Sequence, residues 1–243
     1  MTTPDLLCLT LIAFELLFDH FVVWRAFLRR SQVDPNRARL WLYPALVGEL
    51  WVLVACVLSL WLYQGRRWAL LRLSAPHGWR LWISLALVSA LSAGLAASVV
   101  RLARLRRRKR VTMRGQAAAH APHTRRELGW WAAVSLSAGF SEELIFRGFL
   151  IWAFQPLLGL WGAGALSLIV FAAAHGYQGA AGALAVGVVG AFLTVVVLIF
   201  GSLWPAMAMH LLIDLQQGFA AWLVLQKAPD PKLVATSPVP SST

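Results

Sequence analysis

Charged residues are scarce in this sequence. Asp, Glu, Lys and Arg together make up 13% of the 243 residues, whereas 59% of the residues are hydrophobic. An ordinary soluble domain carries about a quarter charged residues, so the composition excludes a soluble globular protein and indicates a membrane protein. At about 20 residues per crossing, seven helices and their loops use the whole chain. No room is left for a separate soluble enzyme domain.

Cysteine is nearly absent as well. Cys8 and Cys56 both lie in apolar runs, and neither a disulfide framework nor a Cys-type zinc spacing can be formed from them. The N-terminus lacks the basic region of a signal peptide, so we expect the first apolar run to be a retained helix. The net charge of +12 comes from Lys and Arg between the apolar runs rather than along an amphipathic face, which argues against a nucleic-acid partner.

Long apolar runs dominate what is present. They predict an all-α fold, a polytopic transmembrane helix bundle of about seven spans within a range of six to eight. Small residues in the sixth run, Gly179 to Gly190, predict a central and tightly packed helix. The runs are 6–24, 40–63, 79–100, 128–153, 158–176, 180–200 and 203–225.

The basic residues predict an orientation. Five arginines follow the first run, and ten Lys and Arg residues lie between positions 101 and 126. The positive-inside rule places both loops in the cytoplasm and the N-terminus outside. The basic loop at 101–114 can also bind anionic lipid headgroups. We expect an integral, multi-pass protein in the plasma (inner) membrane of a bacterium.

Ionisable residues inside the apolar runs are the candidate functional residues, because a charge at the bilayer centre costs roughly 2.5–3.5 kcal/mol on insertion scales. The fourth run contains Glu142, Glu143 and Arg147. Glu143 and Arg147 are four residues apart and share a helix face. Arg147 can therefore neutralise one carboxylate and leave Glu142 free to act as a base.

Two further runs complete the set. His175 lies in the fifth run, and His210 and Asp214 lie four residues apart in the seventh, so that Asp214 can orient the imidazole. Taken singly, each group also fits a structural ion pair or a polar contact between helices. Together they supply a base, a counter-cation, two imidazoles and a second carboxylate, which indicates water-dependent chemistry in a membrane cavity.

The first two runs carry further acids. Glu15 and Asp19 are four residues apart and are followed by His20, and Glu49 lies in the second run. Because Glu15 and Asp19 are a like-charge pair, we expect one of them to be neutral or paired with a cation elsewhere. They line a substrate gate, contact a partner or pack against polar atoms of other helices.

Three motifs on successive apolar segments resemble those of the CAAX protease and bacteriocin-processing (CPBP, Abi) family of intramembrane proteases. The motifs are Glu142-Glu143-x-x-x-Arg147, Phe171-x-x-x-His175 and His210-x-x-x-Asp214. The resemblance covers about 128–226 and implies a catalytic membrane core there. Transmembrane helices with basic loops precede it at 1–127, and a polar, Pro-rich tail that we expect to be disordered follows at 227–243.

The resemblance implies hydrolysis of a peptide bond in a membrane-associated peptide or protein tail by a glutamate-activated water. On that pattern Glu142 is the base, His175 holds the same water, and Glu143 and Arg147 shape the electrostatics.

His210 would then stabilise the oxyanion. The family often has Asn where this sequence has Asp214. Because an ionised Asp only accepts hydrogen bonds, we assign Asp214 to orienting His210.

Metal use stays open at this stage. His175, His210 and either Glu142 or Glu143 could form a zinc site with two His and one carboxylate. The sequence has no His-Glu-x-x-His motif, so we favour a metal-free glutamate mechanism with no cofactor. Two other hypotheses stay open, a non-catalytic scaffold or immunity protein and a proton-coupled transporter.

The apolar runs do not bring the candidate residues to one depth. Glu142 lies about 20 Å from a helix start at Leu128, whereas His175 is near the end of its own run. A common site therefore requires that the fourth helix enters the lipid later, that the fifth continues toward Gly182, or that helices are tilted or broken.

Overall fold

All regular elements in the residues that the computed structural model describes, 2–108, 113 and 116–226, are helices. The predicted tail at 227–243 and positions 109–112 and 114 of the predicted lipid-binding loop lie outside these residues. In chain order the helices are α1 (Thr3–Phe18), η1 (Asp19–Val23), α2 (Trp24–Val33), α3 (Pro35–Tyr63), η2 (Trp68–Leu71), α4 (Trp79–Arg108), α5 (Gln116–His120), α6 (Arg125–Glu142), η3 (Glu143–Leu150), α7 (Ile151–Ala174), η4 (His175–Gln178), α8 (Gly179–Phe200) and α9 (Trp204–Leu225).

Five helical stretches of the described residues are long and apolar enough to cross a membrane. They are Thr3–Val33, Pro35–Tyr63, Trp79–Arg106, Arg125–Phe200 and Trp204–Leu225. Large hydrophobic side chains on their outer faces are exposed, for example Trp82 and Leu184, both at 71%, as expected of side chains that face lipid. The predicted all-α membrane bundle is thus confirmed.

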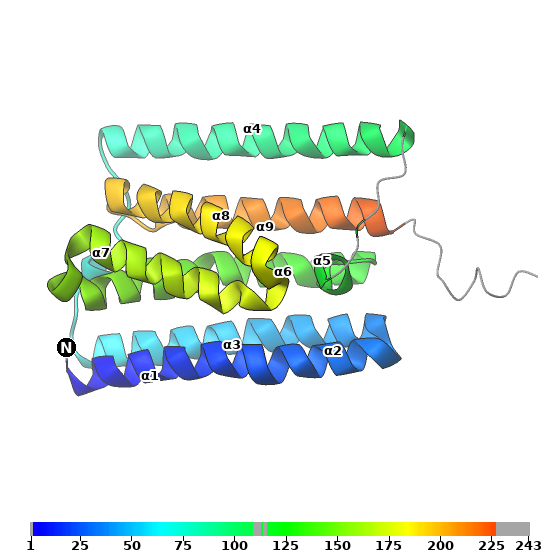
Figure 1. Ribbon diagram of the computed structural model, residues 1–243. Helices are drawn as coiled ribbons and strands as arrows, with labels where there is room; N and C mark the ends of the chain where they lie inside the picture. The colour runs from blue at the N-terminus through cyan, green and yellow to red at the C-terminus, as the bar shows by residue number, and fades with distance from the viewer. Residues whose placement is uncertain (1, 109–112, 114–115, 227–243) are drawn as a thin grey trace, which may run out of the picture.

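The fourth stretch, Arg125–Phe200, folds back on itself twice. Gly159 has φ 69° and ψ 174° inside α7, a conformation that favours glycine, and the chain reverses direction there (Figure 1). The second reversal follows η4, where Gly179 has φ 80°. The stretch therefore contains three passes, over residues 125–158, 160–174 and 179–200.

These passes differ in length from the predicted runs 128–153 and 158–176. At 1.5 Å per residue the first pass extends roughly 50 Å and the second only roughly 22 Å, against a hydrocarbon thickness of about 30 Å. The prediction was wrong here because the helix continues through Pro156 to the turn at Gly159. The short second pass brings His175 level with Glu142, since both side chains line one cavity. A broken helix therefore resolves the mismatch in depth.

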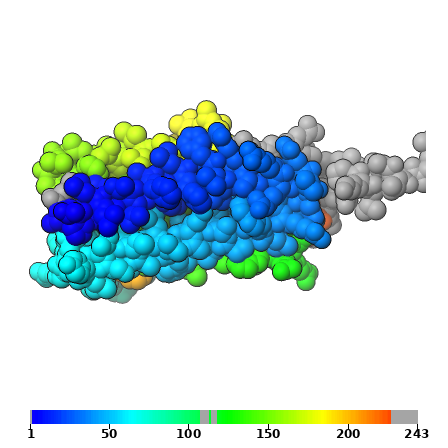
Figure 2. Space-filling view, turned by 90° about the horizontal axis from the view of Figure 1, so that it is seen from below, coloured from blue at the N-terminus to red at the C-terminus, as the bar shows by residue number. Residues whose placement is uncertain are grey.

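The passes form a layered bundle around α6. Helix α6 packs between α3 and α9, and α9 also packs against α4 and α8. In Figure 1, α1, α2 and α3 lie on one side, α4 lies on the opposite side, and the segments from α6 to α9 lie between them. Figure 2 shows that residues of α1, α2 and α3 form most of the face seen from below.

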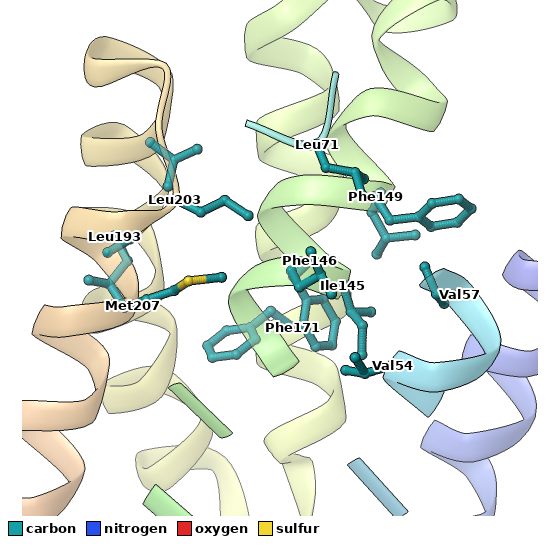
Figure 3. Close-up of a cluster of buried hydrophobic side chains, with 14 of the residues drawn as sticks. Val54, Val57, Leu71, Ile145, Phe146, Phe149, Phe171, Leu193, Leu203 and Met207 are labelled. Carbon is teal, nitrogen blue, oxygen red and sulfur yellow. The ribbon is translucent and has the colours of Figure 1, made fainter. Parts of the chain in front are cut away.

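The hydrophobic core is centred on η3, whose eight residues are all buried. Phe149 of η3 is 1% exposed, Val57 of α3 and Leu193 of α8 are fully buried, and Met207 of α9 is 6% exposed. Figure 3 shows these side chains converging on η3 from neighbouring passes. The segment that carries Glu143 and Arg147 is therefore held by packing on several sides.

Helix α8 packs tightly only in its second half. Gly179 is exposed, Gly182 and Gly187 are half-buried, and burial begins at Gly190. The expectation of a central helix is therefore correct from Gly190 onward and wrong for the first half. Small residues permit a close approach between helices, but no described residue buries the beginning of α8.

A buried ion pair ties α3 to α6. Arg39 Nε donates to Glu127 Oε1 at 2.9 Å, and the two side chains are 3% and 1% exposed. The backbone N–H groups of His123 and Thr124 donate to Glu127 Oε2 at 2.7 and 2.8 Å. Thr124 accepts in turn from the Glu127 backbone N–H, which forms a capping box. One carboxylate thus starts α6 and fixes it to α3.

We predict that Arg39→Met lowers the free energy of unfolding by about 3–5 kcal/mol, because it leaves the Glu127 carboxylate buried without its cation. The control is Arg37→Met, since Arg37 pairs with Asp34 at 3.4 Å while its own side chain is 90% exposed. That variant is expected to lose less than about 1 kcal/mol. Unfolding in detergent, followed by circular dichroism, measures both. Equal losses in the two variants would contradict the prediction.

Candidate active site

The segment η3 places Glu143 and Arg147 on one face. It is π-helical, a form that occurs frequently at functional sites. Arg147 Nη1 donates to Glu143 Oε1 at 3.0 Å, and both side chains are fully buried. The structure thus forms the pair that the spacing of four residues predicts. Glu142, at the end of α6, lies outside this pair.

Arg147 makes three further contacts. Its Nη2 donates to the Gly190 carbonyl at 3.1 Å and its Nε to Thr194 Oγ1 at 3.3 Å, while its Cζ lies 4.1 Å from the centre of the Phe171 ring. The Thr194 hydroxyl itself donates to the Gly190 carbonyl at 2.8 Å. The guanidinium is therefore held by α7 and α8 as well as by Glu143.

His210 of α9 connects the three candidate carboxylates. Its Nδ1 donates to Glu143 Oε1 at 2.9 Å. Its Nε2 lies 3.5 Å from Asp214 Oδ2 and 3.8 Å from Glu142 Oε2. The sequence interpretation assigned the orienting role to Asp214, but the shorter contact is with Glu143. Glu143 therefore does more to fix the plane of the His210 ring.

His175 has a defined tautomer in its neutral form. It lies at the end of the short pass, and its Nδ1 is 2.9 Å from the Phe171 carbonyl oxygen. A carbonyl oxygen only accepts, so Nδ1 carries the proton and Nε2 carries the lone pair. The Phe171 ring packs between the two histidines, with ring centres 4.7 Å from His175 and 6.3 Å from His210.

Four of the six candidate residues line a cavity of about 470 Å³ inside the bundle. Glu142, His175, His210 and Asp214 all contribute to its wall. Oε2 of Glu142 is buried and makes no hydrogen bond with any described residue. Arg147 and Glu143 lie behind this wall, so they act on the cavity through His210 and Phe171 rather than by lining it.

The cavity wall also carries the acids of the first two passes. Glu15 and Asp19 from the first pass and Glu49 from α3 line the same cavity as Glu142. Within 2–108, 113 and 116–226, neither Glu15 nor Asp19 forms an ion pair. The predicted partner cation is therefore not found in this part of the chain. The acids thus line the cavity, and their role as a substrate gate stays a prediction.

Sequence reasoning missed several polar residues of the site. Thr194 supports Arg147, and Tyr177, Gln178 and Gln217 line the cavity. A hydroxyl or amide within an apolar run is a weak signal, because such groups also bond to their own helix backbone. Only the three-dimensional arrangement distinguishes Thr194 from the other serines and threonines in the apolar runs.

The arrangement of the candidate residues bears on whether they hold a metal ion. No group of three or more His, Cys, Asp or Glu side chains in the described ranges has a geometry that could hold a metal ion. One oxygen of Glu143 already accepts from Arg147 and His210, so Glu143 is committed to these contacts. His175 uses Nδ1 for a backbone carbonyl, which leaves its Nε2 available to a ligand, and Oε2 of Glu142 is buried without a hydrogen-bond partner in the described residues.

The comparison with protein families bears on the region that contains the site. Residues 124–216 match the family model described as Type II CAAX prenyl endopeptidase Rce1-like. The match includes all six candidate residues from Glu142 to Asp214 and confirms the resemblance to the CAAX protease family. It covers less than half of the chain and indicates a protease of that class. Searches of the curated proteins and of the solved structures found no match.

We predict that Gly190→Ala destabilises the protein by about 1–3 kcal/mol, as expected for an overpacked core. An added Cβ would lie 2.9 Å from Cδ1 of Phe171 and 3.0 Å from Nη2 of Arg147. Gly187→Ala, in the same helix, is the control, because its Cβ would meet only Ala172 at 3.6 Å. Thermal unfolding in detergent compares them. An unchanged melting temperature for Gly190→Ala would contradict the described packing around Arg147.

Proposed function

We propose that this chain, whose residues 124–216 match the Rce1-like CAAX endopeptidase family, is an intramembrane endopeptidase with a glutamate-activated water. The observation that carries the proposal is the convergence of Glu142, His175 and His210 on one cavity inside the bundle. Such a cavity holds water and a peptide segment apart from the lipid. Its substrate is a membrane-associated peptide or protein tail.

Glu142 is the general base in this proposal. Its free Oε2 takes a proton from a water molecule in the cavity. The lone pair on Nε2 of His175 accepts the second O–H of that water, because Nδ1 is committed to the Phe171 carbonyl. The two groups orient the water oxygen toward the scissile carbonyl carbon. A positioned base of this kind contributes typically 10²–10⁴-fold to the rate.

His210 stabilises the tetrahedral intermediate. In this step His210 is an imidazolium, with Nδ1–H donated to Glu143 and Nε2–H directed to the substrate. Attack by the water oxygen places negative charge on the former carbonyl oxygen, which accepts a hydrogen bond from this Nε2–H. The C–N bond then breaks, and the proton held by Glu142 passes to the leaving nitrogen. The products are a new carboxyl terminus and an amine, and Glu142 returns to the carboxylate.

Glu143, Arg147 and Asp214 position these groups without touching the substrate. Glu143 accepts from Nδ1 of His210, and Arg147 holds Glu143 in place. Asp214, 3.5 Å from Nε2, lies where it restrains the ring from the other side. This arrangement supports a preorganised site, in which the dipoles need no rearrangement during the reaction.

We predict that Glu142→Gln lowers substrate processing by at least about 100-fold, because the amide cannot accept the proton of water. The measurement compares the sizes and new C-termini of membrane and exported proteins in cells that carry the native chain or the variant at matched expression. Loss of defined processed proteins in the variant would also identify the substrate.

The matched control is Glu49→Gln. Glu49 lines the same cavity, and its Oε2 is likewise buried without a hydrogen-bond partner in the described residues. Both variants therefore remove one carboxylate from the cavity, but only Glu142 lies beside His210. Full retention of function by Glu142→Gln would contradict the protease and favour a scaffold. Equal losses in both variants would indicate a general requirement for cavity charge.

We also predict that a metal chelator leaves cleavage unchanged. The proposed steps use carboxylate, imidazole and water only. The test treats the purified full chain in detergent with EDTA or 1,10-phenanthroline and follows cleavage of a substrate found in the preceding experiment. Activity that is lost on chelation and restored by zinc would contradict the metal-free mechanism.

A further inference from the structure

A basic groove lies where α2 ends and α3 begins, away from the proposed catalytic cavity. It has a volume of about 530 Å³, and its wall includes three arginines, Arg29, Arg30 and Arg37, together with Trp41. None of these residues lines the catalytic cavity. On α3, Arg39 and Tyr43 are buried on the inner side, whereas Arg37 is exposed. The groove therefore belongs to the outer side of the helix pair.

The charges in the groove are not balanced by the protein. Asp34 is the acid in its wall, and it pairs with Arg37 at 3.4 Å while also accepting from the backbone N–H groups of Asn36 and Arg37. Arg29 and Arg30 form no ion pair with any described residue. Two exposed guanidinium groups thus face one groove without an anion.

Arg30 is oriented by an aromatic ring. Its Cζ lies 4.1 Å from the centre of the Trp41 ring, a stacking contact that arginine favours. Stacking occupies the face of the guanidinium and leaves its N–H edge free. That edge is a planar fork that matches the oxygens of a phosphate group. Arg30 is therefore presented toward an anion rather than spread over the protein surface.

The groove also has an apolar part, and its position relative to the membrane follows from the apolar runs beside it. Val33 is 83% exposed, and Trp41 is half-buried. The groove lies between the apolar runs 6–24 and 40–63, and Trp41 is at the start of the second run, so the groove lies at a membrane boundary. Tryptophan is enriched at the depth of the lipid headgroups. An occupant with a phosphate and an adjoining apolar chain fits these surroundings.

We propose that this groove binds the phosphate headgroup of an anionic phospholipid, with Arg29 and Arg30 on the phosphate and with Val33 and Trp41 beside the glycerol and acyl region. Basic pockets beside transmembrane helices bind such headgroups in this way. The site is separate from the loop at 101–114, for which lipid binding was predicted from sequence. It is also independent of the proposed protease, so failure of one proposal leaves the other unaffected.

The test measures lipid binding to the purified full chain in detergent by native mass spectrometry. The probes are dioleoyl phosphatidylglycerol, dioleoyl phosphatidylcholine as the zwitterionic comparison, and inorganic phosphate. The groove variant is Arg29→Gln with Arg30→Gln. The matched control is Arg67→Gln with Arg80→Gln, which removes the same charge from exposed positions in the loop and helix start between α3 and α4.

We expect the groove variant to weaken phosphatidylglycerol binding by about tenfold or more, while the control variant binds as the native chain does. Phosphatidylcholine is expected to bind more weakly to the native chain and equally to all variants. Arg29→Lys with Arg30→Lys keeps the charge but loses the fork, and we expect an intermediate affinity. Melting temperatures of all variants establish that each is folded, and both groove positions are exposed.

Three results would overturn the proposal. If the groove and control variants weakened phosphatidylglycerol binding equally, the effect would come from the net charge of the protein and not from the groove. Equal binding of the two lipids would remove the role of the anion. Displacement of phosphatidylglycerol by low millimolar inorganic phosphate would identify a free phosphate, rather than a lipid, as the ligand of the groove.

Discussion

The ion pair between Glu143 and Arg147 is the interaction on which the rest of the structure depends. Both side chains are fully buried, and further hydrogen bonds to such a pair offset its desolvation. Oε2 of Glu143 has no hydrogen-bond partner in the described residues, so the added bonds lie on its Oε1 and on Arg147. Arg147 donates hydrogen bonds to the Gly190 carbonyl and to the Thr194 hydroxyl of α8. Glu143 accepts a hydrogen bond from His210 of α9. Two charges on one π-helical segment thus set the register of three passes, and the apolar core around η3 closes over them.

Much of the fold follows from run length and composition. Seven apolar runs predict the passes because a helix is the one structure that satisfies its backbone within a single segment in lipid. The boundaries between the fourth, fifth and sixth runs are less predictable. Pro156 favours an end to the helix, yet the helix continues to Gly159, since the position of that turn depends on how residues 160–174 pack against α8. The glycines of α8 likewise differ in their surroundings: a Cβ at Gly190 would lie 2.9 Å from the Phe171 ring, whereas one at Gly187 would make an ordinary contact with Ala172 at 3.6 Å.

In the site, too, contacts within one helix could be predicted from the sequence, whereas contacts between distant residues could not. Spacing of four residues predicts that Arg147 reaches Glu143 and that Asp214 lies near His210, because both depend on one helix. The bond between His210 and Glu143 spans 67 residues, and the sequence favoured Asp214 for that role. Glu15 lines the same cavity because of the way the first pass packs against the other helices. Such contacts depend on tertiary packing, for which spacing along one chain carries no information.

The short pass over residues 160–174 has a consequence for the turn that follows it. Its α-helical part is shorter than the hydrocarbon thickness, and the chain continues as the 3₁₀-helix η4 before it reverses at Gly179. Exposed peptide groups within the hydrocarbon are tolerated only beside protein or a water-filled space. His175, Tyr177 and Gln178 of this turn line the cavity, so the turn lies beside protein and the cavity instead of facing lipid alone. The same short pass thus places both a chain reversal and a polar wall inside the bundle.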